Sequence, residues 1–200
     1  MDRVAQPTLT AMKNRGTPFV GVLYCGLAVT SRGLRVIEFN ARFGDPETQP
    51  VLQRMRSPLG RILLAAARGT LDTIEPLVWD ERTAVAVVLA SAGYPESSSK
   101  GDVITGVEAA EADDAVSVLH AGTALNNDGE LITAGGRVLA VVGLGEDLNE
   151  ARETAYEGVG KMSFDGAQHR SDIALKAARG EITVPSVGVG QGASTEGDAQ

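Results

Sequence analysis

Apolar and polar residues alternate strictly over residues 37–43. Such alternation is typical of a strand with one buried and one polar face, because successive side chains of a strand point to opposite sides. The predicted buried face consists of four apolar residues, Ile37, Phe39, Ala41 and Phe43. Glu38, Asn40 and Arg42 then share the polar face, with neighbours roughly 7 Å apart.

The pattern before this strand predicts a short helix over residues 5–14 and a partner strand over Phe19–Val29. The second strand would run from Leu34 to Phe43, and Gly33 would supply the permissive position of the turn between the strands. This part of the chain therefore predicts a helix followed by a β-hairpin.

Two helices are predicted after the hairpin. Asp45 is a suitable N-cap, Pro46 fits the first helical position, and Glu47 in the first turn favours the helix dipole. The second helix would begin after Ser57-Pro58 and end at Gly69.

A change in composition after about residue 80 predicts a second unit, which begins with a buried strand over Ala84–Ala90. Further strands are predicted near Val103–Ile104, Val116–His120, Glu130–Thr133 and Arg137–Val142. Asn127-Asp128-Gly129 and Gly135-Gly136 have the composition of turns. Apolar residues at helical spacing predict a helix over Leu148–Met162. The expected fold class is therefore α+β.

The polar strand face also suggests chemistry. A carboxylate and an amide oxygen suit Mg²⁺, which prefers oxygen ligands and shares its coordination shell with water and phosphates, so Glu38 and Asn40 are candidate ligands. Arg42 is a candidate for holding a phosphoryl or acyl-phosphate oxygen. A solvated strand face beside an ordinary helix start explains the same spacing without any ligand, and the pattern alone leaves both interpretations open.

The run from Glu38 to Gln49, EFNARFGDPETQ, closely resembles the signature of the phosphoribosylamine–glycine ligase family, in the ATP-grasp superfamily. Four other segments support this resemblance: residues 18–27, Gly93-Tyr94-Pro95, His120-Ala121-Gly122-Thr123 and Arg170-Ser171-Asp172-Ile173. Together the segments span about residues 7–175.

The resemblance implies an architecture. Residues 1–78 would be the carboxy-terminal part of an ATP-grasp domain, and residues 79–175 the small mixed β/α carboxy-terminal domain of the family. The chain loses its apolar periodicity from about Lys176, so residues 176–200 are expected to be a disordered tail.

The resemblance also implies a reaction, the ATP-dependent joining of glycine to 5-phosphoribosylamine through glycyl phosphate in purine biosynthesis. Glu38 and Asn40 would bind Mg²⁺ or Mn²⁺ and thereby the ATP phosphates. Arg42 would be the catalytic residue that steadies the transferred phosphoryl group. The substrate-binding residues would be Gly44, Asp45 and Glu47.

Members of this family are about twice as long, so the chain corresponds to a carboxy-terminal portion and is expected to be inactive alone. A separate amino-terminal fragment of the same enzyme is then an expected partner. Two alternatives remain: a non-catalytic remnant, and a different ATP-grasp carboxylate–amine ligase. The Phe43-Gly44-Asp45-Pro46-Glu47 continuation argues against the second alternative.

Composition narrows the classes of partner. The formal charge of −8 argues against general nucleic-acid binding, which requires clustered Lys and Arg. No apolar run is long enough for a membrane span and no signal peptide is visible, so a cytoplasmic location is expected. The single cysteine, Cys25, lies in an apolar run and is interpreted as a packing residue. His120 is a structural residue or a substrate-side residue; the sequence does not decide which.

Overall fold

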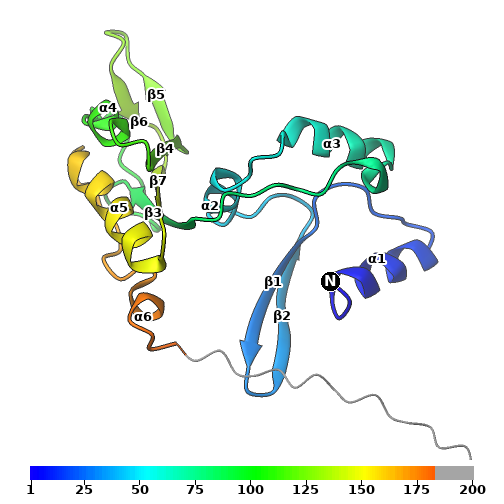
Figure 1. Cartoon of the computed structure of the whole chain (residues 1–200). Coiled ribbons are helices and arrows are strands. Elements are labelled where there is room, and N and C mark those ends of the chain that lie inside the picture. The colour runs from blue at the N-terminus through cyan, green and yellow to red at the C-terminus, as the bar shows by residue number, and fades with distance from the viewer. Residues whose placement is uncertain (183–200) are drawn as a thin grey trace, which may run out of the picture.

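The computed structural model describes residues 1–182, and their elements form two parts joined near Asp80 (Figure 1). The amino-terminal part, residues 5–73, contains α1 (Ala5–Asn14), β1 (Tyr24–Thr30), β2 (Gly33–Asn40), α2 (Thr48–Gln53), α3 (Leu59–Arg68) and the 3₁₀ helix η1 (Leu71–Thr73). The sheet unit, residues 83–178, contains β3 (Thr83–Ala90), α4 (Val107–Glu111), β4 (Val116–His120), β5 (Thr123–Leu125), β6 (Leu131–Thr133), β7 (Arg137–Gly145), α5 (Leu148–Lys161) and α6 (Leu175–Ala178). This mixed content agrees with the predicted α+β class.

Strands β1 and β2 form the predicted antiparallel hairpin. Gly33 adopts φ +90°, and the Thr30 hydroxyl closes the turn by donating to the Gly33 carbonyl over 2.8 Å. Both strands are shorter than predicted. Residues 19–23 are not in a strand, and Gly21 among them has φ +140°, a conformation that L side chains rarely adopt. At the other end, β2 stops at Asn40, before Arg42.

The predicted buried face of this hairpin is exposed. Ile37 is 70% exposed, Phe39 is 43% exposed, and Phe43 lies beyond the strand and is 37% exposed. The alternation was interpreted correctly as a strand and wrongly as a half-buried one. Burial requires a second layer, and no element within residues 1–182 covers this face.

The predicted helix start at Asp45 is also wrong. Helix α2 begins at Thr48, whose N–H and hydroxyl both donate to the Gly44 carbonyl, over 3.3 and 2.6 Å. Residues 44–48 therefore form a turn ahead of the helix, and the Asp45 carboxylate accepts from the Gln49 amide instead of capping. Helix α3 does end at Gly69, as predicted, in the left-handed conformation at φ +68°.

The sheet unit is built around β7, the central strand of an antiparallel sheet with order β3–β7–β4. Every residue of β7 after Arg137 is buried. A strand with neighbours on both sides and packing on both faces requires an apolar sequence, and Val138–Leu144 supplies it. The predicted strands over 84–90, 116–120 and 137–142 are confirmed with small changes of boundary.

Helix α5 covers one face of this sheet and confirms the helix predicted over 148–162. Its amino terminus is capped by Asp147, which accepts a hydrogen bond from the Glu150 N–H over 2.9 Å. Gly143 allows close packing, since a Cβ there would lie 2.3 Å from the Ala155 nitrogen. Ala155 and the glycine therefore bring helix and strand into backbone contact.

Smaller elements complete the sheet unit. Gly129, at φ +80°, lies in the turn of the β5–β6 hairpin, as the sequence predicts. The predicted strand at Val103–Ile104 is reduced to a single bridge between Val103 and Ile132. Helix α6 extends into the segment predicted to be a tail, because the Ala178 N–H continues the helical hydrogen bonding to Ala174. The rest of that prediction, for residues 183–200, lies outside the described residues.

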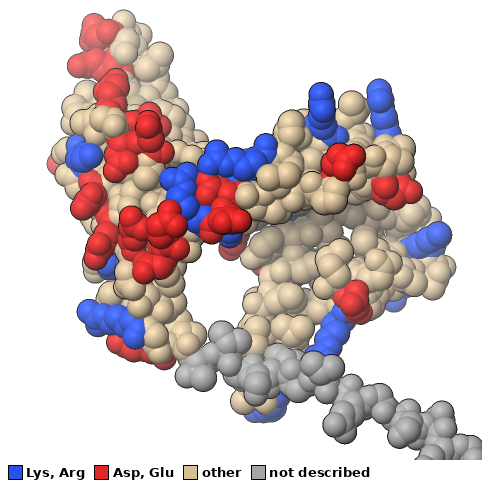
Figure 2. Space-filling model, in the orientation of Figure 1, with Lys and Arg blue, Asp and Glu red and all other residues tan. Residues whose placement is uncertain are grey.

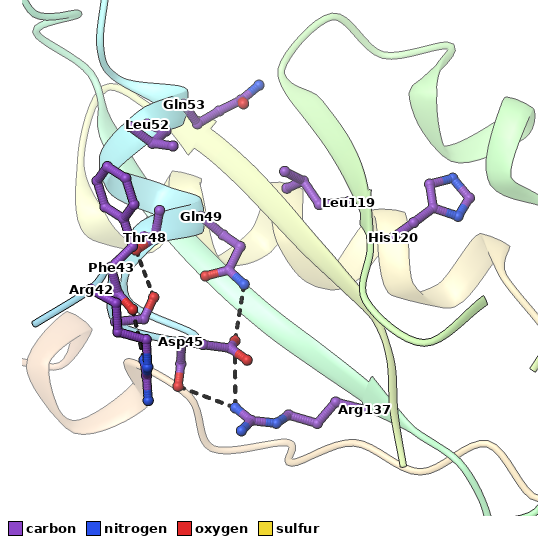
Figure 3. Close-up of a pocket in the computed structure, with 11 residues that line it drawn as sticks. Arg42, Phe43, Asp45, Thr48, Gln49, Leu52, Gln53, Leu119, His120 and Arg137 are labelled. Atoms are coloured by element: carbon purple, nitrogen blue, oxygen red, sulfur yellow. Dashed lines mark hydrogen bonds and ion pairs between the residues drawn. The ribbon is translucent and has the colours of Figure 1, made fainter. Parts of the chain in front are cut away.

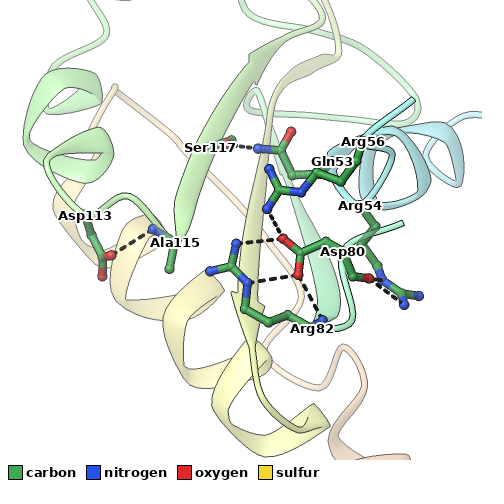
Figure 4. A network of polar contacts seen from close by, with 8 residues as sticks. All are labelled: Gln53, Arg54, Arg56, Asp80, Arg82, Asp113, Ala115 and Ser117. Carbon is green, nitrogen blue, oxygen red and sulfur yellow. Dashed lines mark hydrogen bonds and ion pairs between the residues drawn. The ribbon is translucent and has the colours of Figure 1, made fainter. Parts of the chain in front are cut away.

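The two parts meet at a buried carboxylate (Figure 4). Asp80, only 7% exposed in its side chain, pairs with Arg56 and with Arg82, whose Nη2 lies 2.8 Å from Oδ2. Arg54 donates to the Asp80 carbonyl over 3.1 Å, and Gln53 at the end of α2 hydrogen-bonds Ser117 of β4. These contacts attach α2 to the sheet unit.

Charge is distributed unevenly over the face shown in Figure 2. Acidic side chains are concentrated over the sheet unit, and blue and red side chains intermingle at the junction. The stretch from residue 1 to residue 182 contains no helix that is long and apolar enough to cross a membrane.

Candidate functional site

A cavity of about 600 Å³ lies between the amino-terminal part and the sheet unit (Figure 3). One wall is the turn before α2 with the first turns of that helix, and the other wall comes from β4 and β7. The cavity is lined by Arg42, Phe43, Gly44, Asp45, Thr48, Gln49, Leu52, Gln53, Leu119, His120 and Arg137. The carboxy-terminal half of the predicted signature therefore faces the sheet unit across one space.

Glu38 and Asn40 lie on the same face of β2, as predicted. The Asn40 amide nitrogen donates to Glu38 Oε1 over 3.0 Å. This bond leaves the Asn40 carbonyl oxygen and the second Glu38 oxygen as ligands of the kind that hard divalent cations prefer. The residues present therefore fit a divalent cation in the kind of donor atom.

These two side chains would form only part of a coordination shell. Within residues 1–182, no group of three or more His, Cys, Asp or Glu side chains is placed to hold a metal ion. A cation at Glu38 and Asn40 would take its other ligands from water and phosphate oxygens, which is common for Mg²⁺.

Arg42 was predicted on the same strand face, and this placement is wrong. It follows the last residue of β2, in a bend, and its Nη1 donates to the Phe43 carbonyl over 2.7 Å. The backbone turns here because β2 gives way to the Gly44–Thr48 turn. Arg42 lines the 600 Å³ cavity, whereas Glu38 and Asn40 lie outside its lining.

The predicted substrate residues lie in the turn that follows. Asp45 Oδ1 accepts a hydrogen bond from the Gln49 amide over 3.0 Å. The Glu47 carboxylate folds back over Gly44, where an added Cβ would be 2.6 Å from Glu47 Oε2. A side chain at Gly44 would displace the Glu47 carboxylate. Asp45 is the member of the turn that reaches toward the sheet unit.

Tyr24 was not predicted as a site residue. Its ring lies beside Gly26 of β1 and Gly44 of the turn, 3.4 Å from a Cβ built on Gly26 and 3.2 Å from one built on Gly44. Burial raises the pKa of the Tyr24 phenol, and the carboxylates of Glu47 and Glu38 raise it further. The phenol therefore stays protonated and lies near both the candidate metal ligands and the candidate substrate turn.

Arg137 was also missed. It begins β7, and its Nη1 lies 3.2 Å from the Asp45 carbonyl oxygen and 3.5 Å from Asp45 Oδ1 (Figure 3). The sequence signal was weak, because a single arginine after Gly135-Gly136 looks like an ordinary strand start. Only the folded chain brings it to Asp45.

His120 lines the same cavity, but its ring points away from Asp45 (Figure 3). Its Nδ1 lies 2.9 Å from the Thr123 hydroxyl, within its own loop. This contact favours a role in holding the loop.

Two family models match the chain on either side of the junction. The model of the phosphoribosylglycinamide synthetase ATP-grasp (A) domain matches residues 1–48, and the model of the C domain of the same synthetase matches residues 84–176. The chain belongs to the phosphoribosylglycinamide synthetase family. The resemblance inferred from the signature is thereby confirmed.

Similar proteins of the synthetase family come from several bacteria. The chain is 56% identical over 177 residues to a phosphoribosylamine–glycine ligase of Streptomyces coelicolor, and 48% identical over 184 residues to one of Mycobacterium bovis. These alignments cover 88% and 92% of the chain but 42% of each relative. The chain thus spans less than half the length of the curated relatives it matches.

Solved structures agree with this assignment. The crystal structure of phosphoribosylamine–glycine ligase from Thermotoga maritima matches 84% of the chain and 40% of that protein, with a TM-score of 0.71 and 37% identity. N5-carboxyaminoimidazole ribonucleotide synthetase from the same organism matches with a TM-score of 0.51 and 16% identity, a likeness of fold alone.

Proposed function

We propose that this chain supplies the carboxy-terminal part of a phosphoribosylamine–glycine ligase. The reaction joins glycine to 5-phosphoribosylamine, consumes ATP and releases ADP and phosphate. The observation that carries the proposal is the cavity in which Arg42 and Asp45 of the signature face Arg137 of the sheet unit. Family membership of both parts supports the same conclusion.

Glu38 and Asn40 are proposed to hold Mg²⁺ or Mn²⁺ together with the ATP phosphates. When bound, such an ion neutralises phosphate charge and orients the γ-phosphoryl group. The amide-to-carboxylate hydrogen bond between the two residues fixes both side chains before the ligand arrives.

In the first step, a glycine carboxylate oxygen bonds to the γ-phosphorus and the bond to the ADP oxygen breaks, which gives glycyl phosphate and ADP. Arg42 would donate to the transferred phosphoryl group, whose oxygens carry the charge of the transition state. Its position at the cavity wall supports this role.

In the second step, the nitrogen of phosphoribosylamine bonds to the acyl carbon, the bond to phosphate breaks, and the nitrogen loses a proton as the amide forms. The site that holds the amine next to the acyl phosphate would be formed by Gly44, Asp45 and Glu47. Asp45 is suited to orient the amine, because its carboxylate accepts hydrogen bonds at the edge of the cavity. No side-chain nucleophile is required.

The domain organisation is part of this proposal. Residues 1–78 would belong to the ATP-grasp domain and residues 79–175 to the C domain, in a cytoplasmic enzyme. The rest of the ATP-grasp domain would come from an amino-terminal polypeptide. Exposure of Ile37 and Phe39 supports this, because an apolar strand face is costly to leave in water.

Glycinamide ribonucleotide formation by the purified chain tests the proposal, with and without an added amino-terminal fragment. We expect turnover only in the mixture. Turnover by the chain alone would refute the need for the missing part. A folded mixture without any turnover would favour a non-catalytic remnant.

Glu38→Ala tests the metal assignment in the same mixture. We expect turnover to fall on the order of 100-fold or more, because the metal ion that would hold the ATP phosphates loses a protein ligand. Glu153→Ala, at an exposed position of α5, is the matched control and should leave the rate unchanged. A near-normal rate for Glu38→Ala would overturn the assignment.

A further inference from the structure

Three segments that supported the family resemblance, but have no role in the proposed reaction, meet beside the start of β7. They are Gly93-Tyr94-Pro95, the His120–Thr123 loop and the segment around Arg170, and they meet at the Gly135-Gly136-Arg137 turn. The Ser91 N–H donates to the Gly136 carbonyl over 2.9 Å, and Gln168 Nε2 donates to the Tyr94 carbonyl over 3.1 Å. Separate loops of the sheet unit therefore build one rim.

Glycines make this meeting possible. A Cβ on Gly136 would lie 2.4 Å from Cδ2 of Tyr94, so the aromatic ring packs directly against the glycine backbone. A Cβ on Gly122 would lie 2.6 Å from the Arg137 carbonyl oxygen. Both positions exclude a side chain, and their packing brings the Tyr94 ring beside Arg137.

Two of these segments, those of Tyr94 and Arg170, line a second cavity of about 340 Å³, a size common for small-molecule sites. It is lined by Val88, Ala90, Tyr94, Arg137, Gln168, His169 and Arg170. Arg137 lines this cavity and also the 600 Å³ cavity that contains Arg42 and Asp45. The two cavities therefore adjoin at the Arg137 side chain.

The donors at this boundary suit a phosphate group. Among the described residues, Arg137 bonds Asp45 through Nη1, and no partner occupies its Nε or Nη2. Arg170 binds Asp172 through Nε and Nη2, at 2.8 and 2.6 Å. Arginine forks match phosphate oxygens, and the Nε and Nη2 donors of Arg137 can bind a phosphate while Nη1 keeps its contact with Asp45.

We infer that Arg137 and the 340 Å³ cavity bind the phosphomonoester of the amine substrate, an inference that rests on the proposed function. The amine and the phosphate lie at opposite ends of phosphoribosylamine. If the amine reacts near Arg42 and Asp45, the phosphate must lie farther away, and the cavity beyond Arg137 is lined by a second arginine. The contact between Arg137 and Asp45 then links phosphate binding to the signature turn.

Titration of the isotope-labelled chain with ribose 5-phosphate, followed by nuclear magnetic resonance, tests this site without ATP or glycine. We expect shifts at Tyr94, Arg137 and Gln168, with at least about a tenfold loss of affinity in Arg137→Gln, since a charge-assisted hydrogen-bonding partner is removed. Ribose should not bind. Inorganic phosphate should shift the same residues more weakly; equal affinity for it would overturn recognition of a sugar phosphate.

Arg179→Gln makes the same change at an arginine with a 62% exposed side chain, and should leave the affinity unchanged. Arg137→Lys keeps the charge without the fork and should be intermediate. If Arg137→Gln fails to fold, Arg170→Gln on the same cavity should also weaken binding. Unchanged affinity in the folded variants, shifts elsewhere, or no binding at millimolar ribose 5-phosphate would overturn the inference.

Turnover with the amino-terminal fragment separates this inference from the proposed function. Arg137→Gln should raise the KM for phosphoribosylamine about tenfold and leave the KM for glycine unchanged. Normal turnover with an unchanged KM for phosphoribosylamine would refute the phosphate site alone. Absence of turnover, with ribose 5-phosphate binding still dependent on Arg137, would refute the proposed function alone.

Discussion

The two parts of the molecule have similarly apolar strands but opposite burial. In residues 1–78, only Gly26, Gly44 and Ala65 are buried. The sheet unit buries an extended core that includes Leu89, Leu139 and Val141. An apolar strand therefore predicts that one of its faces is buried. It does not specify whether the element that buries this face belongs to the same chain.

The contrast predicts where the stability of the chain resides. The sheet unit carries its own core, so it should unfold cooperatively and dominate the free energy of unfolding. The hairpin and α1 have few buried contacts. Without the proposed amino-terminal fragment they should contribute little to the free energy of unfolding.

The largest expected effect comes from the core of the sheet unit. Leu139 is fully buried in β7, and Leu139→Ala should lower the free energy of unfolding by about 3 kcal/mol through lost burial and a cavity. Urea unfolding followed by circular dichroism measures this change.

Leu27→Ala, on the 44% exposed hairpin position, is the matched control and should change stability by less than about 1 kcal/mol. Equal losses in the two variants would remove the distinction between the two parts.

Backbone contact inside the sheet unit should give the next effect. Gly143→Ala forces a methyl group against the backbone of α5 and should cost about 1–3 kcal/mol. Gly160 lies in α5, where an added Cβ would meet open space, and Gly160→Ala should stabilise by up to about 1 kcal/mol because alanine favours helix. Calorimetry should therefore show a lower Tm for Gly143→Ala and a higher Tm for Gly160→Ala. Decreases in Tm of similar size in both variants would contradict the close packing of β7 against α5.

Substitution of Asp80, at the junction of the two parts, should have a smaller and pH-dependent effect on stability. Hydrogen bonds from Arg82, and further contacts with Arg56, hold the pKa of Asp80 well below its ordinary value. A lowered folded-state pKa contributes stability that is complete above the unfolded value of about 4 and is lost as pH falls below it. Asp80→Asn should lower the Tm by roughly 5 °C at pH 7 and flatten the Tm profile between about pH 5 and pH 2.

Exposed Asp72→Asn serves as the control for Asp80→Asn, with an unchanged Tm at pH 7. An acid profile of Asp80→Asn that matches the unsubstituted chain would show that the junction carboxylate does not contribute to stability.

The smallest effect on stability is expected at the exposed strand face. Ile37→Ser should change the free energy of unfolding by less than about 0.5 kcal/mol, because the side chain is 70% exposed. It should nevertheless weaken binding of the amino-terminal fragment about tenfold or more in a calorimetric titration, as burial of an isoleucine is lost. Ile182→Ser, at a 56% exposed residue beyond the end of α6, should affect neither quantity.

Elements that local chemistry specifies could be predicted from the sequence. The long apolar run of β7, the periodicity of α5, and the glycine turns at Gly33 and Gly129 each specify an element without distant help. The helix start at Asp45 was predicted wrongly, because the Gly44 carbonyl accepts hydrogen bonds from both the N–H and the hydroxyl of Thr48 and the helix begins there.

Only the signature side of the candidate site could be predicted from the sequence. Glu38, Asn40 and Arg42 were predicted from alternation along one strand, and Asp45 from the family motif. Arg137 is 92 residues from Asp45 along the chain, and no periodicity connects the two. Long-range contacts of this kind depend on how α2 packs against the sheet, which the pattern of single elements does not specify.

The β1–β2 hairpin has a consequence for handling the protein. Within residues 1–182 it is a sheet of only two strands, so each strand keeps an outer row of amide and carbonyl groups without a ladder partner. Such edges, next to apolar side chains, are templates for pairing between molecules. Purified chain should therefore self-associate as its concentration rises, and co-expression with the proposed amino-terminal fragment should suppress that aggregation.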